Sequence, residues 1–169
     1  MSEPKIELRP AQQYLGIAGE IMDGVPAFVD RAFPELFGWL GEHAVEPAGP
    51  PFIRYGEMDA DGEPLELEVG VPVNPDVPAN LDAPASASAN GASRVRADAL
   101  PAGRYLTYLH IGPYRSETLP DLAAARARLL SWAEARGLTI RGCLEHFRIG
   151  PVEEPDFTTW ETEFAYLIA

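Results

Sequence analysis

The sequence contains a single cysteine, Cys143, among 169 residues. One cysteine excludes an internal disulfide and leaves no cysteine set for a zinc finger or an iron–sulfur cluster. The three histidines do not show the spacing of a metal-ligand pair, so we expect neither a metal nor a cofactor. Phosphate-binding and dinucleotide-binding glycine motifs and a serine nucleophile elbow are also missing, which leaves nucleophilic catalysis with little support.

Basic side chains are scarce: 13 Lys and Arg stand against 26 Asp and Glu, giving a formal net charge of -13. Such a surface repels a phosphate backbone, so direct nucleic-acid binding is not expected. Apolar runs are short, and none reaches the about 18 residues that a membrane-spanning helix needs. Residues 1–5 are not followed by the apolar segment of a signal peptide, so we expect a cytoplasmic protein without membrane contact.

Apolar residues make up 46% of the chain, which is enough to bury one sizeable core. Helical periodicity predicts helices over 26–44 and 119–136. The first should have a kink or break at Pro34. The second should begin with a capping box at Thr118 and end before Gly137. The sequence at 59–62 predicts a turn. Residues 74–93 are rich in Pro, Ala and Ser, which is typical of a linker. Extended segments are expected at 6–22, 52–58, 65–71, 94–99, 104–111, 144–149 and 160–168.

The last strand, 160–168, alternates most clearly. Its apolar and aromatic face carries Trp160, Thr162, Phe164, Tyr166 and Ile168, and its other face carries Glu161, Glu163, Ala165 and Leu167. A face with two carboxylates and small or apolar neighbours is typical of a strand that lines a groove. Glu163 is therefore the best single candidate for a functional residue, although a solvated sheet face is the more common place for two such glutamates.

The order strand, helix, strand, strand occurs twice, in half-repeats 1–73 and 94–169 of one domain. The matching segments are 14–15 with 105–106, Trp39 with Trp132, 53–56 with 147–150, and 67–70 with 162–165. A lone βαββ unit cannot bury its sheet, so we expect an α+β fold: duplicated βαββ units with pseudo-two-fold symmetry, an antiparallel sheet, two main helices and a central ligand groove. Glu66, Glu68, Glu161 and Glu163 would flank that groove, or else lie apart along exposed edges.

Several short motifs are similar to one known family. The run YLTYLHIGPY at 105–114 resembles the strand–HxGPY–helix signature of GyrI-like small-molecule-binding domains, also called AraC-type effector-binding or multidrug-regulator C-terminal domains. The LxxWAxxxG helix end at 129–137, the EHF strand at 145–147 and the closing TEF at 162–164 also fit that pattern. The resemblance covers essentially the whole chain and depends on the order of these motifs.

The resemblance implies a groove at the pseudo-two-fold axis, lined by aromatic side chains, with a buried glutamate on the last strand. In multidrug regulators of this kind the glutamate meets lipophilic cations, and Glu163 occupies the matching position. The chain departs from the pattern in lacking a proline near 166–168 and in its long linker. No helix-turn-helix region precedes the first strand, so the resemblance implies a stand-alone domain related to transcription regulators.

Flat aromatic rings attract cations, and each ring in the strands is a candidate for the groove wall as well as for the core. Tyr108 and His110 share one face of their strand, opposite Tyr105, and either face could line the groove. The expected ligand-binding residues are Glu163, Glu161, Glu68, Tyr14, Phe52, Tyr55, Tyr105, Tyr108, His110, Phe147 and Trp160.

We expect a domain that binds, sequesters or senses a lipophilic small molecule, cationic or aromatic in character. A second hypothesis follows from relatives that hydrolyse cyclopropane rings of DNA-alkylating natural products, in which case Glu163 would be catalytic, with Tyr108 or Trp160 beside it. A third is a protein-interaction module with a protein partner, as in relatives that inhibit DNA gyrase. The oligomeric state is left open.

Overall fold

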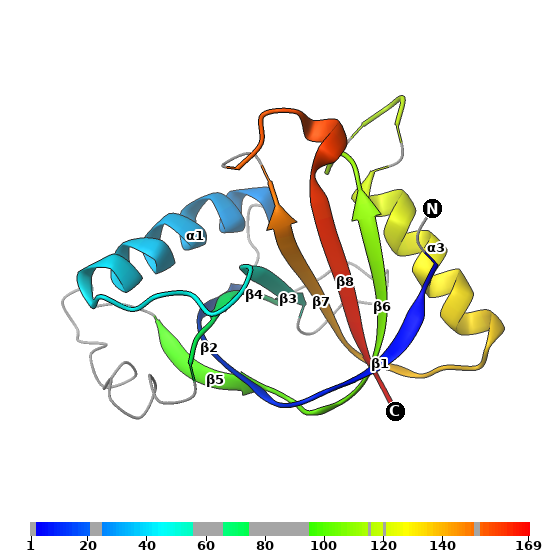
Figure 1. Ribbon diagram of the computed structural model, residues 1–169, viewed down its shortest axis with the longest axis horizontal. Helices are drawn as coiled ribbons and strands as arrows, with labels where there is room; N and C mark the ends of the chain where they lie inside the picture. Colours follow the sequence, from blue (N-terminus) through cyan, green and yellow to red (C-terminus); the bar gives the residue numbers. More distant parts are fainter. Residues whose placement is uncertain are drawn as a thin grey trace. The chain divides into compact units, whose positions relative to one another are not determined.

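The computed structural model describes residues 3–20, 25–55, 66–74, 95–114, 116–119, 121–150 and 153–169. The chain divides into two compact units: unit 1 comprises Met1–Arg9 and Gly103–Ala169, and unit 2 comprises Pro10–Ala102. Within the described residues, each unit combines a four-stranded antiparallel sheet with one long helix, which is the expected α+β fold (Figure 1). The turn at 59–62 and nearly all of the linker 74–93 lie outside the described residues.

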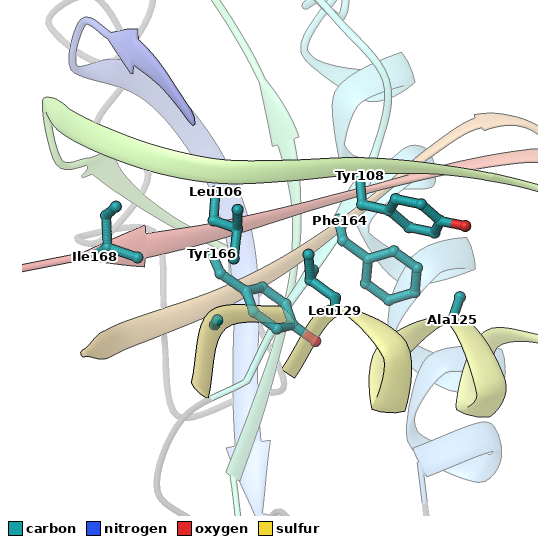
Figure 2. Close-up of a cluster of buried hydrophobic side chains, with 8 residues drawn as sticks. Leu106, Tyr108, Ala125, Leu129, Phe164, Tyr166 and Ile168 are labelled. Carbon is teal, nitrogen blue, oxygen red and sulfur yellow. The ribbon is translucent and has the colours of Figure 1, made fainter. Parts of the chain in front are cut away.

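Unit 1 has the strand order β1-β6-β8-β7, and every neighbouring pair is antiparallel. Its elements are β1 (Lys5–Arg9), β6 (Gly103–Ile111), α3 (Leu122–Ala135), β7 (Ile140–Ile149), the short 3-10 turn η1 (Phe157–Thr159) and β8 (Glu161–Ile168). The helix α3 packs on the sheet face that carries Phe164, Tyr166 and Ile168 (Figure 2). The alternation of the last strand therefore buries its aromatic side chains as expected.

Helix α3 starts later than predicted because its N-terminal cap is Asp121 and not Thr118. The Asp121 carboxylate accepts a hydrogen bond of 3.1 Å from the backbone amide of Ala124, which satisfies one of the free amides of the first turn. The predicted helix end is confirmed: Gly137 has φ +67°, and the amide of Leu138 donates to the carbonyl of Ala133 at 3.0 Å. This pairing is the Schellman ending that glycine favours.

Unit 2 has the strand order β3-β4-β2-β5. Its elements are β2 (Gln12–Glu20), α1 (Val25–Glu42), β3 (Phe52–Tyr55), β4 (Glu66–Pro72) and β5 (Arg96–Leu100). Of the predicted kink or break at Pro34, the break is wrong, because α1 runs through the proline, which is exposed. The helix lies close to β2 at Gly19, where an added Cβ would meet the Phe28 ring at 2.8 Å.

Strand register confirms the duplication of the βαββ pattern. Gly16 pairs with Gly70 and Ala18 with Glu68 in unit 2, while Thr107 pairs with Ala165 and Leu109 with Glu163 in unit 1. Glu68 and Glu163 therefore occupy the same position in the two units.

The outer strands β1 and β5 depart from the simple halves 1–73 and 94–169. β1 leads into β2 along the chain but pairs with β6, and β5 leads into β6 but pairs with β2. Each unit thus takes its edge strand from the segment that precedes the first strand of the other unit. Among the described residues, no helix combines the length and apolar character needed to cross a membrane.

The core of unit 1 can be tested at two adjacent leucines of α3. Leu129 is fully buried against the sheet, whereas Leu130 is 42% exposed. We expect Leu129→Ala to lower the free energy of unfolding by about 2–5 kcal/mol, because it removes packed methyl groups and leaves a cavity. Leu130→Ala, measured beside it by urea denaturation, should change the free energy by less than about 1 kcal/mol. Equal losses in the two variants would contradict the packing of α3 described above.

Candidate functional site

The face of the unit 1 sheet opposite α3 carries Glu163, and we call it the Glu163 face. Pairing places Leu109 and His146 beside Glu163, because each lies directly opposite it on a neighbouring strand. Tyr105 and Glu161 share this face by alternation along β6 and β8. Of the two faces of β6, the one that carries Tyr105 is therefore the one that carries Glu163.

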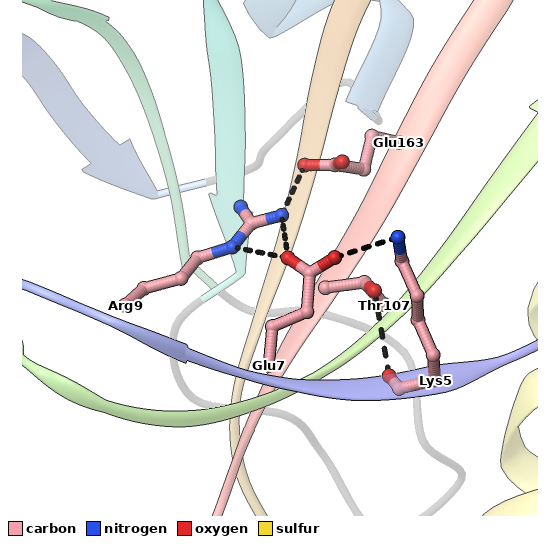
Figure 3. Close-up of polar contacts among 5 residues, drawn as sticks. All are labelled: Lys5, Glu7, Arg9, Thr107 and Glu163. Carbon is pink, nitrogen blue, oxygen red and sulfur yellow. Dashed lines mark hydrogen bonds and ion pairs between the residues drawn. The ribbon is translucent and has the colours of Figure 1, made fainter.

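A chain of alternating charges runs across the Glu163 face. Arg9 Nη2 donates to Glu163 Oε1 at 2.9 Å and to Glu7 Oε2 at 3.1 Å, and Arg9 Nε donates to the same Glu7 oxygen at 3.3 Å (Figure 3). Lys5 Nζ lies 2.9 Å from the other Glu7 oxygen. The Arg9 guanidinium carbon is also 6.0 Å from the centroid of the Tyr105 ring. The carboxylates of Glu7 and Glu163 are thus matched by the two cations, Lys5 and Arg9.

The electrostatics of Arg9 follow from this arrangement. Burial alone would lower the pKa of Arg9, but the charges and hydrogen bonds of Glu163 and Glu7 outweigh it and raise that pKa. The hydrogen bond from Lys5 is the main reason why the pKa of Glu7 is lowered. Sequence reasoning missed Arg9, although Lys5, Glu7 and Arg9 alternate in the sequence as one polar strand face.

His146 is the titratable neighbour of Glu163 on β7. Burial lowers the pKa of His146 to about 4, and the nearby charge of Glu163 offsets only part of this effect. The imidazole is therefore neutral at pH 7 and brings no second cation to the Glu163 face. Within the described part of the chain, no three His, Cys, Asp or Glu side chains gather in a way that could hold a metal ion.

The corresponding face of unit 2, which we call the Glu68 face, is built around a phenol. Tyr14 donates its hydroxyl proton to Glu68 Oε1 at 2.6 Å, and Arg54 Nη1 donates to the Tyr14 oxygen at 3.1 Å. Arg54 Nη1 lies 3.9 Å from Glu68 Oε1. Burial raises the pKa of Glu68, although the bond from Tyr14 opposes the shift. Burial, together with Glu68, also raises the pKa of Tyr14.

Two glycines make room for the rings of the Glu68 face. An added Cβ at Gly70 would collide with the Phe52 ring, and one at Gly16 would lie 3.1 Å from the Tyr14 ring and 2.7 Å from a backbone oxygen. The two rings meet edge to face with centroids 5.1 Å apart. Tyr14 and Phe52, both expected in the site, therefore lie together on the face of Glu68.

The two units differ in the cation that reaches each glutamate. Register sets Arg54 opposite Glu68 and His146 opposite Glu163, so Arg54 corresponds to His146 and not to Arg148 as the sequence match suggested. Arg148 lies two residues beyond the position that faces Glu163, so only in unit 2 does the strand β3 supply an arginine opposite the glutamate. Unit 1 instead receives Arg9 from its added edge strand β1.

Other candidate residues lie away from the two glutamate faces. Tyr108 packs with Phe164 in the core on the α3 side, and His110, on the same side of β6, has Nε2 3.2 Å from the Pro113 carbonyl oxygen. Tyr55 pairs with Leu67, on the face of β4 opposite Glu68. Neither Tyr108 nor His110 is therefore placed to act beside Glu163.

Phe147 and Trp160 join a separate aromatic cluster in unit 1. Both rings pack against Tyr114, with centroid distances of 5.5 Å and 4.6 Å, and Trp160 Nε1 donates to the Glu154 carbonyl oxygen at 2.7 Å. Phe147 pairs with Thr162, whose side chain points away from the Glu163 face. The structure thus separates these rings from the glutamate with which the sequence grouped them.

The neutral state of His146 predicts how stability depends on pH. An unfolded histidine takes up its proton near pH 6.5, whereas folded His146 does so only near pH 4. Between these values the unfolded state binds more protons, so the stability falls as the pH falls, by at most about 1.4 kcal/mol per pH unit.

Two measurements check this expectation. Urea denaturation at several pH values should show a shallower loss of stability for His146→Gln than for the native protein over this range. The imidazole resonances of His146, identified by their absence in the variant, should not move between pH 7.5 and 5.5. A titration centred near the ordinary histidine value would contradict the burial of this ring.

Comparison with known proteins was made on sequence and on structure. The model of a family described as GyrI-like small molecule binding domain matches residues 2–165. A search of curated proteins found no match.

Among solved structures, the EcmrR C-terminal domain is 17% identical with a TM-score of 0.74, over 100% of this chain and 98% of that one. In the EcmrR–DNA complex the chain spans only 57% of the regulator. SAV2435 bound to tetraphenylphosphonium is 12% identical with a TM-score of 0.63, over 99% and 94% of the two chains. A hydrolase from Listeria innocua is 16% identical with a TM-score of 0.58, over 99% and 92%.

Proposed function

Because the chain belongs to the GyrI-like small-molecule-binding domain family, we propose that it binds a lipophilic cation at the Glu163 face. The observation that carries this proposal is the contact between Arg9 and Glu163. A guanidinium is a flat, delocalised cation with weak hydration, and here it donates a hydrogen bond to a carboxylate and lies 6.0 Å from the centroid of an aromatic ring. The Glu163 face therefore already holds the kind of group that the proposed ligand would present.

Partial burial of this contact also supports the proposal. The Glu163 side chain is 22% exposed and that of Arg9 27%, so the charges are shielded from most water but remain reachable. A carboxylate in such a place attracts a cation more strongly than one in bulk water. The Tyr105 ring is only 3% exposed and lies 6.0 Å from the Arg9 guanidinium carbon, so an apolar cation would contact this ring only where the guanidinium now lies.

The neighbours suggest a probe for this proposal. SAV2435 was solved with tetraphenylphosphonium, a lipophilic cation. We expect Glu163→Gln to weaken the binding of tetraphenylphosphonium at least tenfold, or about 1.4 kcal/mol, because the variant keeps the side-chain shape and removes the charge. Isothermal titration calorimetry measures the affinity directly. Glu134→Gln removes one charge from an exposed position on α3 and should leave the affinity within twofold. Equal affinities for native protein and Glu163→Gln would contradict the proposal.

A second candidate function is hydrolysis, as in relatives that open cyclopropane rings. The contact that favours it is in unit 2, where the partly buried Glu68 carboxylate accepts a hydrogen bond of 2.6 Å from the Tyr14 hydroxyl and has a raised pKa. A carboxyl group of this kind is suited to proton transfer. One neighbour is named as a hydrolase. Incubation with a cyclopropane-containing alkylator, followed by mass spectrometry, separates the two functions: a product with water added supports the enzyme, and binding without product supports the binding domain.

A further inference from the structure

We propose that Arg9 is an internal counterion of Glu163, which a lipophilic cation displaces on binding and which thereby sets the charge preference of the Glu163 face. This inference rests on the proposed function. It assigns a specificity-determining role to a residue of β1, the strand that unit 1 takes from the start of the chain.

The geometry makes Arg9 a direct competitor of any cationic ligand. Its Nη2 atom lies 2.9 Å from Glu163 Oε1, the distance of a charge-assisted hydrogen bond. A cation that approaches this carboxylate meets an acid whose charge is already matched. Binding therefore gains little unless the guanidinium moves aside, and the free energy of breaking that bond is subtracted from the affinity.

Displacement is feasible because Arg9 has a second anchor. Arg9 Nε and Nη2 both donate to Glu7 Oε2, at 3.3 Å and 3.1 Å, and neither bond involves Glu163. An arginine that leaves Glu163 therefore remains paired with Glu7 and is not left as an isolated buried charge. The large penalty for breaking a buried ion pair is avoided in this way.

The other titratable groups on the Glu163 face do not take over this role. His146 lies opposite Glu163, but burial lowers its pKa to about 4 and leaves it neutral at pH 7. Lys5 is 71% exposed and contacts the oxygen of Glu7 that Arg9 does not use. Glu161 shares the face and is an acid. Among the described residues, Arg9 is thus the cation whose contacts place it on Glu163, where it can discriminate between ligands.

The effect of Arg9 on ligand affinity should consequently have opposite signs for cationic and anionic ligands. A cation competes with the guanidinium for Glu163, whereas an anion of the same shape can pair with the guanidinium itself. Tetraphenylphosphonium and tetraphenylborate are such a pair, since both present four phenyl rings and they differ in the sign of their charge.

The test compares Arg9→Gln, Arg9→Lys and Arg104→Gln with the native protein, by calorimetric titration with both ions near pH 8. Arg9→Gln should bind tetraphenylphosphonium at least about fivefold more tightly and tetraphenylborate at least about fivefold more weakly, within the usual range of coupling between two groups. Arg9→Lys keeps the charge and should remain within twofold of the native protein for both ions. Arg104 is exposed and its side chain lies on the opposite face, so Arg104→Gln measures the effect of net charge alone.

Two further measurements make the outcome decisive. Circular dichroism and the melting temperature of each variant show whether unit 1 still folds, and Arg9→Lys provides the comparison if Arg9→Gln is less stable. In the double variant Arg9→Gln/Glu163→Gln the gain for tetraphenylphosphonium should vanish, because the arginine acts only through Glu163.

Failure of this inference differs from failure of the proposed function. If Glu163→Gln weakens tetraphenylphosphonium binding but Arg9→Gln leaves it unchanged, the function stands and the counterion role of Arg9 is overturned. If neither the native protein nor Arg9→Gln binds tetraphenylphosphonium, both fall. An equal gain in Arg9→Gln and Arg104→Gln would show a general charge effect and would also overturn the role of Arg9.

Discussion

The antiparallel register between β6 and β8 is the constraint on which the Glu163 face depends. It sets Leu109 opposite Glu163 and Tyr108 opposite Phe164. A slip by one residue would turn Glu163 toward α3 and expose Phe164, since side chains alternate strictly along a strand. The register is held by the core, where Phe164 and Tyr166 pack with Leu129 of α3 (Figure 2). Apolar burial on one face thus fixes the positions of charges on the other.

Much of the fold could be predicted from the sequence because its signals are local. The alternation of 160–168, the glycine after α3 and the doubled βαββ order each arise from a few neighbouring residues, and the structure shows all three. The equivalence of Glu68 and Glu163 followed from the same matches. Local signals failed for the break at Pro34, because α1 continues through the exposed proline, and at the cap of α3, where Asp121 was read as the partner and not as the cap itself.

The candidate site was harder to predict because its contacts are long-range. Arg9 and Glu163 are separated by 154 positions in the chain, and no periodicity in either segment indicates that they meet. The pairing exists because β1 joins β6 and not the strand that follows it. Residues 105–110 posed another difficulty, since aromatic side chains lie on both faces of that strand. Only the packing of Tyr108 on α3 decides which ring accompanies the glutamate.

The partners of the two equivalent glutamates are packed differently, and this difference is the reason for proposing Glu163, and not Glu68, as the acid that meets a ligand. The Tyr14 ring that serves Glu68 lies tightly over Gly16 and edge to face with Phe52, so its hydroxyl is held in place. Releasing that acid would require a buried ring to leave a packed position, at a cost in both contacts and strain.

Arg9 reaches Glu163 instead through a long, partly exposed side chain whose other bonds are to Glu7. Rotation about its side-chain bonds can move the guanidinium away from Glu163 while the core and the backbone stay as they are. The same acid in the same position of two repeats is therefore hydrogen-bonded to a packed phenol in unit 2 and to a long arginine side chain in unit 1. On this proposal the partner of each carboxylate, more than the carboxylate itself, decides whether a ligand can replace that partner.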